Sequence, residues 1–202
     1  MQYNYIDWDA RKKPYPLLTK AIEIFNSIDG KTVVEVGSMR TPIEGDVYSF
    51  DLQSSMEGHS SLLFAMSSQE FHTVDIDMKV SKIAYKILKK LNTKNWNVYN
   101  GDGIKFLKDF KSQIDLLFLD AWDVGTPNYA ENHLKVYEAA KPNLSKQHII
   151  LIDDTDIGQT PERGMHIDEE CMGGKGKILI PYLLENGYKV RFKGRQVCLT
   201  NF

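Results

Sequence analysis

The stretch that decides the fold is residues 32–38, TVVEVGS, in which a short run of mostly β-branched residues ends at a glycine. A buried parallel strand followed by a tight loop has this pattern. Three further apolar runs repeat it, at 71–76 (FHTVDI), 114–119 (IDLLFL) and 148–152 (HIILI). These four runs are the predicted strands of a central sheet.

The intervals around these strands have the three- and four-residue spacing of amphipathic helices. Helices are predicted at 16–28, 60–66, 79–91, 103–109, 128–140 and 177–186, and a short strand at 97–99. Near the end, Lys193-Gly194 separates two further strands, 188–192 and 196–200, as the turn of a hairpin. Strand and helix alternate, which predicts an α/β fold: a Rossmann-like, doubly wound, mostly parallel seven-stranded sheet with a C-terminal antiparallel hairpin.

Length and composition are those of one soluble globular domain: 202 residues, 42% hydrophobic and 26% charged. No low-complexity tract, linker or repeat interrupts the chain, so we expect residues 1–202 to form a single domain, with an N-terminal segment and helix at 1–30. The 25 basic and 27 acidic residues give a net charge of -2, which disfavours a nucleic-acid partner.

The distribution of apolar residues along the sequence also disfavours a membrane protein and a secreted protein. No apolar run approaches the roughly 20 residues that span a bilayer, and the N-terminus lacks the apolar core of a signal peptide. We therefore expect no membrane partner and a cytoplasmic location. The two cysteines, Cys171 and Cys198, lack metal-binding or disulfide spacing, and we expect both to be reduced and structural.

Carboxylates follow nearly every predicted strand. In an open α/β sheet, ligands bind outside the carboxyl ends of the strands. Carboxylates crowded at one edge repel one another unless a cation or a hydroxyl-rich ligand is present, so this edge is the predicted ligand site. Its acidic residues are Glu35, Asp75, Asp102, Asp120, Asp153 and Asp154.

The first strand and its loop have features of a nucleotide site. Gly37 permits close backbone approach to a ligand, and the helix opening near Gly58 and Ser60 offers free N–H groups. The alternative is an ordinary tight turn, because the spacing is not GxGxxG. Asp75 favours the cofactor interpretation, since a carboxylate there can accept hydrogen bonds from both ribose hydroxyls. Asp102 can cap the helix at 103–109, contact a ligand, or do both.

Three of these carboxylates point to a metal. Asp120 and the Asp153-Asp154 pair each directly follow an apolar run that should be a central strand. Carboxylates from neighbouring strand ends are hard oxygen ligands, suited to Mg²⁺, Mn²⁺ or Ca²⁺. The sequence therefore predicts a divalent cation, Mg²⁺ or Mn²⁺, held by Asp120, Asp153 and Asp154.

With these motifs the chain resembles the class I S-adenosylmethionine-dependent methyltransferases. EVG resembles the first cofactor motif, TVDID the ribose-binding acid, NGDG the adenine-side loop and IDLLFLDAW the fourth motif. An Asp after the fourth strand and Asp-Asp after the fifth resemble the metal-dependent O-methyltransferases, of the catechol and macrocin (sugar) types. The resemblance implies S-adenosylmethionine as cofactor, with Asp120, Asp153 and Asp154 on the metal. The cofactor residues it implies are Glu35, Gly37, Gly58, Ser60, Asp75, Asp102 and Asp120.

Two departures from the family pattern stand out. Residues 38–57 separate Gly37 from Gly58, and we expect this insertion in the cofactor loop to overhang the site. The lysine that the catechol enzymes carry three residues after the first metal-binding Asp is Asp123 here. Asp123 is therefore the first candidate for the general base, and His166 and His133 follow it. The alternatives are a turn cap for Asp123, a solvated loop for His166 and packing for His133.

Two further segments are expected near the acceptor. The stretch with Gly158 and residues 164–176 reads as a flexible loop, with acceptor recognition or no role as the alternatives. Aromatic residues either form an apolar lid or simply pack in the core. They are Tyr3, Tyr5, Trp8, Tyr15, Trp122 and Tyr129.

These observations predict a methyltransferase that acts, with metal assistance, on a hydroxyl of a small molecule, a sugar or vicinal diol. A small hydroxylated acceptor is thus the expected partner, and a homodimer is left open. One alternative is an NAD-dependent dehydrogenase, which Asp75 permits, although GxGxxG and Tyr-x-x-x-Lys are missing. The other is a non-catalytic binding protein with the same fold.

Overall fold

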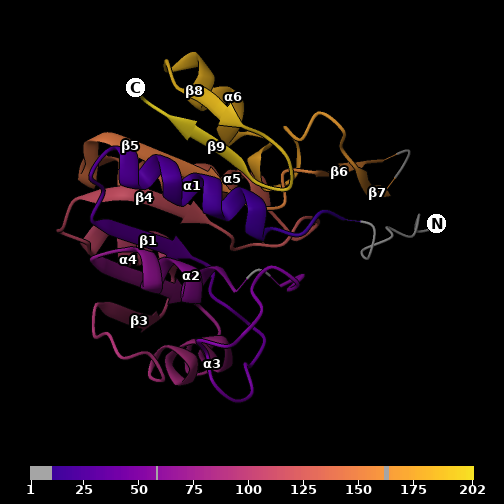
Figure 1. Cartoon of the computed structure of the whole chain (residues 1–202). Helices are drawn as coiled ribbons and strands as arrows, with labels where there is room; N and C mark the ends of the chain where they lie inside the picture. The colour runs from indigo at the N-terminus through magenta and orange to yellow at the C-terminus, as the bar shows by residue number, and fades with distance from the viewer. Residues whose placement is uncertain (1–10, 58, 162–163) are drawn as a thin grey trace.

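A seven-stranded sheet runs through the centre of the computed structural model, which describes residues 11–57, 59–161 and 164–202 (Figure 1). The strand order is β3-β2-β1-β4-β5-β9-β8, parallel from β3 to β5 and antiparallel where β9 pairs with β5 and β8. This confirms the predicted fold class and the C-terminal hairpin. The strands are β1 (Thr32–Val36), β2 (Glu70–Asp75), β3 (Trp96–Asn100), β4 (Ile114–Leu119), β5 (Leu144–Ile152), β8 (Lys189–Phe192) and β9 (Val197–Thr200).

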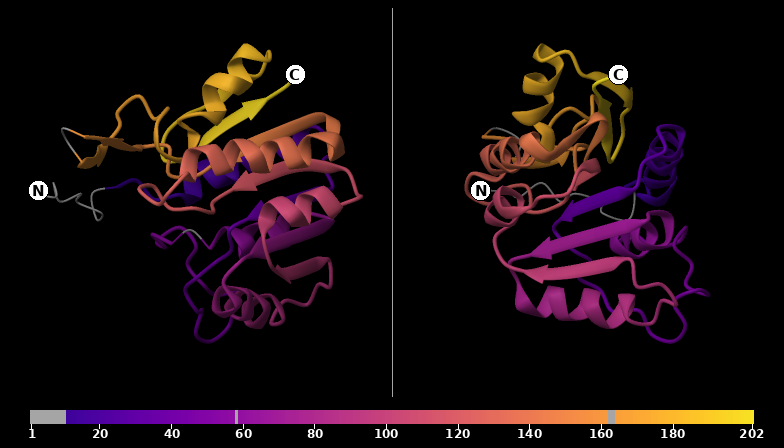
Figure 2. Two further views of the ribbon diagram at one scale, coloured as in Figure 1. Left: turned by 180° about the vertical axis from the view of Figure 1, so that it is seen from behind. Right: turned by 90° about the vertical axis from the view of Figure 1, so that its left-hand side faces the viewer.

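Helices cover both faces of the sheet (Figure 2). Side chains alternate along each strand, so Val33 packs with the helices of one face and Val34 with those of the other. The helices of the first face are α1 (Tyr15–Ser27), α2 (Ser60–Ser67) and α3 (Met78–Leu88). Those of the second are α4 (Gly103–Asp109), α5 (Tyr129–Ala140) and α6 (Leu179–Glu185). Among the described residues no helix has the length and apolar character needed to cross a membrane.

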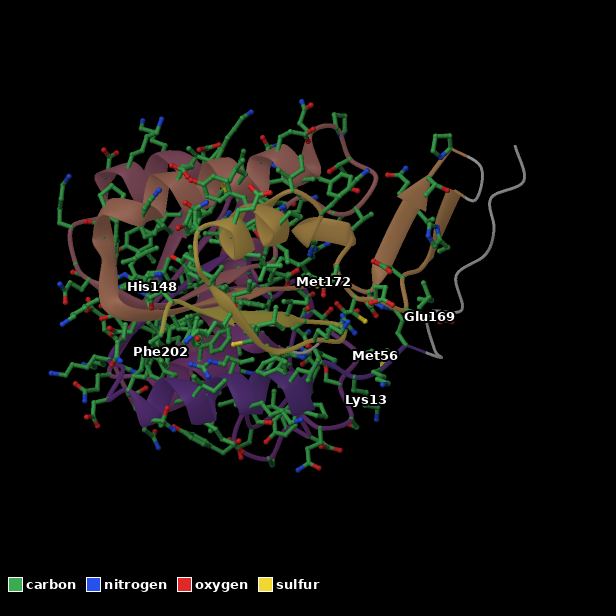
Figure 3. All side chains as sticks on the ribbon, turned by 90° about the horizontal axis from the view of Figure 1, so that it is seen from above. Lys13, Met56, His148, Glu169, Met172 and Phe202 are labelled. Atoms are coloured by element: carbon green, nitrogen blue, oxygen red, sulfur yellow. The ribbon has the colours of Figure 1, made fainter. Side chains whose placement is uncertain are left out.

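The segment after β5 is more ordered than the sequence predicts. Instead of a flexible loop, β6 (Ile157–Thr160) and β7 (Gly164–Ile167) form a separate antiparallel hairpin, which stands off the main body (Figure 3). A 3₁₀ turn, η3 (Gly174–Gly176), follows it, and another, η2 (Lys141–Asn143), links α5 to β5. The sequence predicts a flexible loop here and no strands, because two short strands that pair with each other need no apolar run to mark them.

The insertion at residues 38–57 packs onto the molecule. Ile43 and Val47 are buried in the same core as α2 and α3. Lys90, just after α3, donates from Nζ to the carbonyl oxygens of Ile43 and Gly45, both at 3.0 Å. Only the two ends of the insertion reach the carboxyl edge of the sheet, so it frames the site there more than it overhangs it.

Candidate functional site

Two adjoining cavities open where the parallel strands end. Met56 and Met172 mark this end in Figure 3, and His148 and Phe202 lie at the opposite end. The first cavity, about 360 Å³, lies over the ends of β1, β2 and β4, and the second, about 540 Å³, lies on the side of β5. Both are lined by Arg40, Asp120 and Asp123. The topology rule that ligands bind at this edge therefore agrees with the hollows of the molecule.

Gly37 forms the floor of the first cavity. Its φ is +90°, a conformation that L side chains rarely adopt, and its N–H donates to the Val74 carbonyl at 2.9 Å. A Cβ built on Gly37 would lie 2.5 Å from both the carbonyl carbon and the oxygen of Asp120. Glycine is thus required for β1 and β4 to end this close together.

Two predicted cofactor carboxylates line the first cavity. The side chain of Asp75 accepts the N–H groups of Ser38 at 3.0 Å and Asp77 at 2.8 Å, one on each oxygen, and burial raises its pKa. Each oxygen keeps a lone pair for a ligand. Asp102 caps α4 by accepting the Lys105 N–H at 2.8 Å, so capping and a place in the cavity wall coexist.

Glu35 has a different position from the one predicted. It is fully buried below α2 and lines neither cavity. The Ser60 hydroxyl donates to Oε1 at 2.6 Å, the Ser61 hydroxyl donates to Oε2, and burial raises the pKa of Glu35 to about 7. Glu35 therefore anchors the start of α2, and Ser60 lines the second cavity instead of the first. Gly58 lies outside the described residues.

Asp120, Asp153 and Asp154 do converge. One carboxylate oxygen from each lies within 4.8 Å of the others, as the predicted metal site requires. However, the ammonium of Lys175 lies among them, with Nζ 2.5 Å from Asp120 Oδ1 and 2.9 Å from Asp154 Oδ2. Lys175 is fully buried, and although burial opposes its charge, Asp120 and Asp154 raise its pKa well above the ordinary value.

Three arginines complete the neutralisation of this cluster. Arg11 Nη2 lies 2.8 Å from Asp154 Oδ1 and also pairs with Asp156, and its side chain is 4% exposed. Arg195 Nε lies 3.9 Å from Asp153 and from Asp154, and Arg40 binds Asp123 through two hydrogen bonds of 2.8 and 3.0 Å. The carboxylates are Asp120, Asp123, Asp153, Asp154 and Asp156, and the cations are Arg11, Arg40, Lys175 and Arg195.

The pKa values of Asp153 and Asp154 are shifted in opposite directions. Burial and the neighbouring charges of Asp154 and Asp120 raise the pKa of Asp153, to which Gln196 donates a hydrogen bond. Burial also acts on Asp154, but Lys175 and Arg11 outweigh it and lower its pKa. The five carboxylates of the cluster face four cations, so the acidic cluster is close to electrically balanced.

A divalent ion does not fit this arrangement. Both carboxylate oxygens of Asp154 are already paired, Oδ1 with Arg11 and Oδ2 with Lys175, and Oδ1 of Asp120 also holds the Lys175 ammonium. A divalent ion among these carboxylates would therefore lie next to that ammonium, and the two cations would repel each other. The convergence of the three carboxylates follows the sequence prediction, but the metal assigned to them is not supported. Sequence reasoning missed Lys175, Arg11 and Arg195 because none of them follows a parallel strand of the sheet. Lys175 lies in η3, Arg11 precedes α1, and Arg195 lies in the turn between β8 and β9.

The three candidate bases differ in their position relative to the two cavities. Asp123 lines both cavities, but the hydrogen bonds from Arg40 lower its pKa, so it is ionised and a weakened proton acceptor. His166 lies on β7 beside Gly158 and lines neither cavity. His133 is buried, its pKa is lowered to about 4 chiefly by burial, and its ring packs edge-on against Trp122. His133 is thus a packing residue.

Few of the aromatic residues expected in a lid reach the cavities. Trp122 lines the first cavity, whereas Tyr15 and Tyr129 pack partly buried against core clusters. Tyr3, Tyr5 and Trp8 lie outside the described residues.

Cys198 is buried, Cys171 is half-buried, and both are free thiols. Ile157 and Met165 of the β6–β7 hairpin line the second cavity, where they supply apolar surface.

The fold is shared with solved methyltransferases. A protein assigned as a caffeoyl-CoA O-methyltransferase from Staphylococcus aureus is 14% identical over 92% of this chain and 82% of its own, with a TM-score of 0.63. An O-methyltransferase from Bacillus cereus in complex with S-adenosylhomocysteine (SAH) is 12% identical over 99% and 83%, with a TM-score of 0.62. A SAH-bound methyltransferase from Podospora anserina is 16% identical over 91% and 76%, with a TM-score of 0.60.

Sequence comparison identifies the family. No curated protein matches this sequence. The family model of the spermine/spermidine synthase domain, however, matches residues 20–173, which is more than half of the chain and reaches from α1 to the loop before η3. The chain therefore has the fold of the class I S-adenosylmethionine-dependent methyltransferases and belongs to the spermine/spermidine synthase domain family.

Proposed function

We propose that this protein is an S-adenosylmethionine-dependent methyltransferase that acts on a hydroxyl group of a small molecule. The observation that carries the proposal is the junction of the two cavities at Asp120 and Asp123. A cofactor held in the first cavity could present its methyl group at this junction to an acceptor held in the second cavity. Holding the two reactants together in this way removes the entropic cost of their encounter. That cost is a large part of the free-energy barrier to such a transfer.

The first cavity suits the adenosine part of the cofactor. Asp75 would accept the ribose hydroxyls, because it lines this cavity and a backbone N–H group holds each of its oxygens in place. Asp102 would lie at the adenine edge, and Gly37 would let the methionine part approach the backbone of β1. These assignments follow the family motifs and agree with the cavity lining.

The second cavity suits a compact polar acceptor. Its volume of about 540 Å³ is within the range of small-molecule sites. Its carboxylates are mostly paired with arginine or lysine, so a neutral molecule that donates hydrogen bonds fits it better than an ion does. Met39, Met56 and Met165 supply apolar surface beside these groups. A sugar or vicinal diol, which has C–H faces and hydroxyl donors, matches this lining.

The reaction is an in-line displacement. A lone pair of the acceptor oxygen forms the new bond to the methyl carbon, the bond from that carbon to sulfur breaks, and S-adenosylhomocysteine leaves. The acceptor hydroxyl loses its proton, and Asp123 is the base we propose, because its ionised carboxylate lines both cavities. No step requires a metal ion.

A second candidate is transfer to an amine. The family is named for the synthesis of spermine and spermidine, which are polyamines, and the second cavity is lined by Asp120, Asp123, Asp153 and Asp154. A cationic acceptor is complementary to carboxylates that are not already paired. Here the adjacent arginines and Lys175 cancel most of that attraction, so we rank this candidate second.

The first test is calorimetric titration of the protein with S-adenosylmethionine, S-adenosylhomocysteine and NAD. We expect both adenosyl ligands to bind and NAD not to bind. Asp75→Ala should lower the affinity for S-adenosylmethionine by roughly tenfold or more, since a hydrogen bond to a charged group is worth about 1.5 to 3 kcal/mol. Asp46→Asn, an exposed carboxylate of the insertion, is the matched control. NAD binding alone would support a dehydrogenase instead.

The second test identifies the transferred group. Sugars, diols and polyamines are offered with S-adenosylmethionine or its decarboxylated form, and the nucleoside product is identified by mass spectrometry. Methyl transfer leaves a homocysteine-type thioether, whereas transfer of the aminoalkyl chain leaves methylthioadenosine. Methylated sugars or diols support the first candidate, and methylthioadenosine formed with an amine supports the second.

A further inference from the structure

We propose that Lys175 is the resident cation of this site: its ammonium takes the place of a divalent ion among Asp120 and Asp154 and holds their carboxylates in position without a metal. The observation is the pair of contacts from Nζ, 2.5 Å to Asp120 Oδ1 and 2.9 Å to Asp154 Oδ2. Nζ also donates to the Asp120 carbonyl oxygen at 3.2 Å, so three donors of one ammonium are accounted for at this site.

The local sequence explains how a lysine reaches this point. Lys175 lies in the stretch 173–176, GGKG, whose last three residues form η3. Gly174 has a φ of +50°, and a Cβ there would overlap the carbonyl oxygen of Asp154. A Cβ on Gly176 would collide with Ile180. Gly174 therefore lets the backbone pass close to Asp154, and Gly176 lets it pass close to Ile180, which places the Lys175 ammonium against Asp120 and Asp154.

The position of Lys175 defines what it can do. Its side chain is fully buried and lines neither cavity, so it cannot bind an acceptor oxygen as a metal ion would. It is a positioning residue that acts through Asp120 and Asp154. Orientation of the acceptor then depends on hydrogen bonds that its hydroxyl groups donate to the carboxylates, which is consistent with a hydroxylated substrate.

The consequence for catalysis rests on the proposed function, but the site assignment can be tested without it. Mn²⁺ binding is measured by electron paramagnetic resonance, with no cofactor or acceptor present. We expect the wild-type protein to bind Mn²⁺ no better than Asp120→Asn does. Lys175→Met leaves the three carboxylates without their central cation, so we expect it to bind Mn²⁺ at least about tenfold more tightly than the wild type.

Three controls define the result. Lys177→Met removes an exposed lysine two residues away and should leave Mn²⁺ binding unchanged. The double variant with Lys175→Met and Asp154→Asn should lose the Mn²⁺ affinity that Lys175→Met alone gains. We also expect Lys175→Met to melt at a lower temperature than the wild type and Mn²⁺ to restore part of the loss, a readout that an ordinary packing defect would not show.

Two outcomes would overturn the assignment. One is tight Mn²⁺ binding by the wild type that Asp120→Asn abolishes. The other is a folded Lys175→Met that gains no Mn²⁺ affinity. If Lys175→Met does not fold, the wild type and Lys175→Arg decide, and neither should bind Mn²⁺. Failure of the proposed function is a separate result, because it would appear as a lack of binding to S-adenosylmethionine with the Mn²⁺ data unchanged.

Discussion

Gly37 lies directly against the backbone of Asp120, so that a methyl group added at position 37 would meet the Asp120 carbonyl carbon and oxygen at 2.5 Å. The contact joins the ends of β1 and β4, which both contribute to the wall of the first cavity. The position of Asp120 relative to the first cavity thus depends on the absence of a side chain at residue 37.

Gly37→Ala is expected to disrupt the site. The substitution forces β1 and β4 apart and places alanine at a φ of +90°, so S-adenosylmethionine affinity should fall by roughly tenfold or more and the melting temperature should drop. Gly45→Ala is the matched control, because Gly45 has a φ of +75° but nothing lies within 4 Å of its added Cβ. Equal loss of affinity in both variants would show that backbone strain, and not the contact with Asp120, is responsible.

Glu35→Gln is expected to change the pH dependence of stability. Burial raises the pKa of Glu35 from its ordinary value of 4.5 to about 7 in the folded protein, so folding takes up a proton between these values. The favourable contribution of the protonated carboxyl is therefore present below pH 4.5 and lost as the pH rises to 7. Relative to the wild type, Glu35→Gln should gain stability from pH 5 to pH 8, on the order of 3 kcal/mol.

The measurement for Glu35 is urea unfolding of both proteins at several pH values. Glu23→Gln, on the exposed side of α1, is the matched control. A pH-independent difference for Glu35→Gln would mean that Glu35 has an ordinary pKa in the folded state.

Arg11→Ala and Arg40→Ala should have very different effects on stability. The Arg11 side chain is 4% exposed and binds Asp154 and Asp156, so its removal leaves buried charge uncompensated and should cost about 3 to 5 kcal/mol. Arg40 is half-exposed, and the loss of its pair with Asp123 should cost about 1 kcal/mol or less. Urea unfolding at neutral pH tests both, and similar losses in the two variants would contradict the assignment of Arg11 to a buried network.

Asp123→Asn and His166→Gln distinguish the two predicted bases. Asp123 lines both cavities, so as the base its amide variant should lose a hundredfold or more of the transfer rate, the range ascribed to general bases. His166 lines neither cavity, and His166→Gln should stay within about twofold of the wild type. The rates are measured with saturating cofactor on an acceptor found in the product screen. A small effect of Asp123→Asn on the transfer rate would mean that solvent or another group accepts the proton of the acceptor hydroxyl.

Apolar patterns predict the central sheet well, because β1, β4 and most of β5 are buried on both faces and read as continuous apolar runs. The edges are harder to predict. β5 begins at Leu144, where it pairs with Ile114 beyond an irregularity in the register, and this polar portion has no apolar run to mark it. The β6–β7 hairpin, with the sequences IGQT and GMHI, was missed for the same reason.

The acidic half of the site could be predicted, and the basic half could not. Asp75, Asp120 and Asp154 follow strands, so the topology of a parallel sheet is enough to place them together. Lys175 and Arg11 reach the same point through a 3₁₀ turn and an N-terminal segment, and no periodicity encodes that. The density of glycines around Lys175 was the available signal.

The ion pairs of Arg11 join residues 143 and 145 positions apart in the chain. During synthesis from the N-terminus, Arg11 emerges long before its partners, and Asp120 and Asp154 emerge before Lys175 and before Gln196 of the final hairpin. Contacts of such long separation form late in folding. The acceptor side of the site is therefore completed only when nearly the whole chain is available, because its contacts join residues from Arg11 to Gln196.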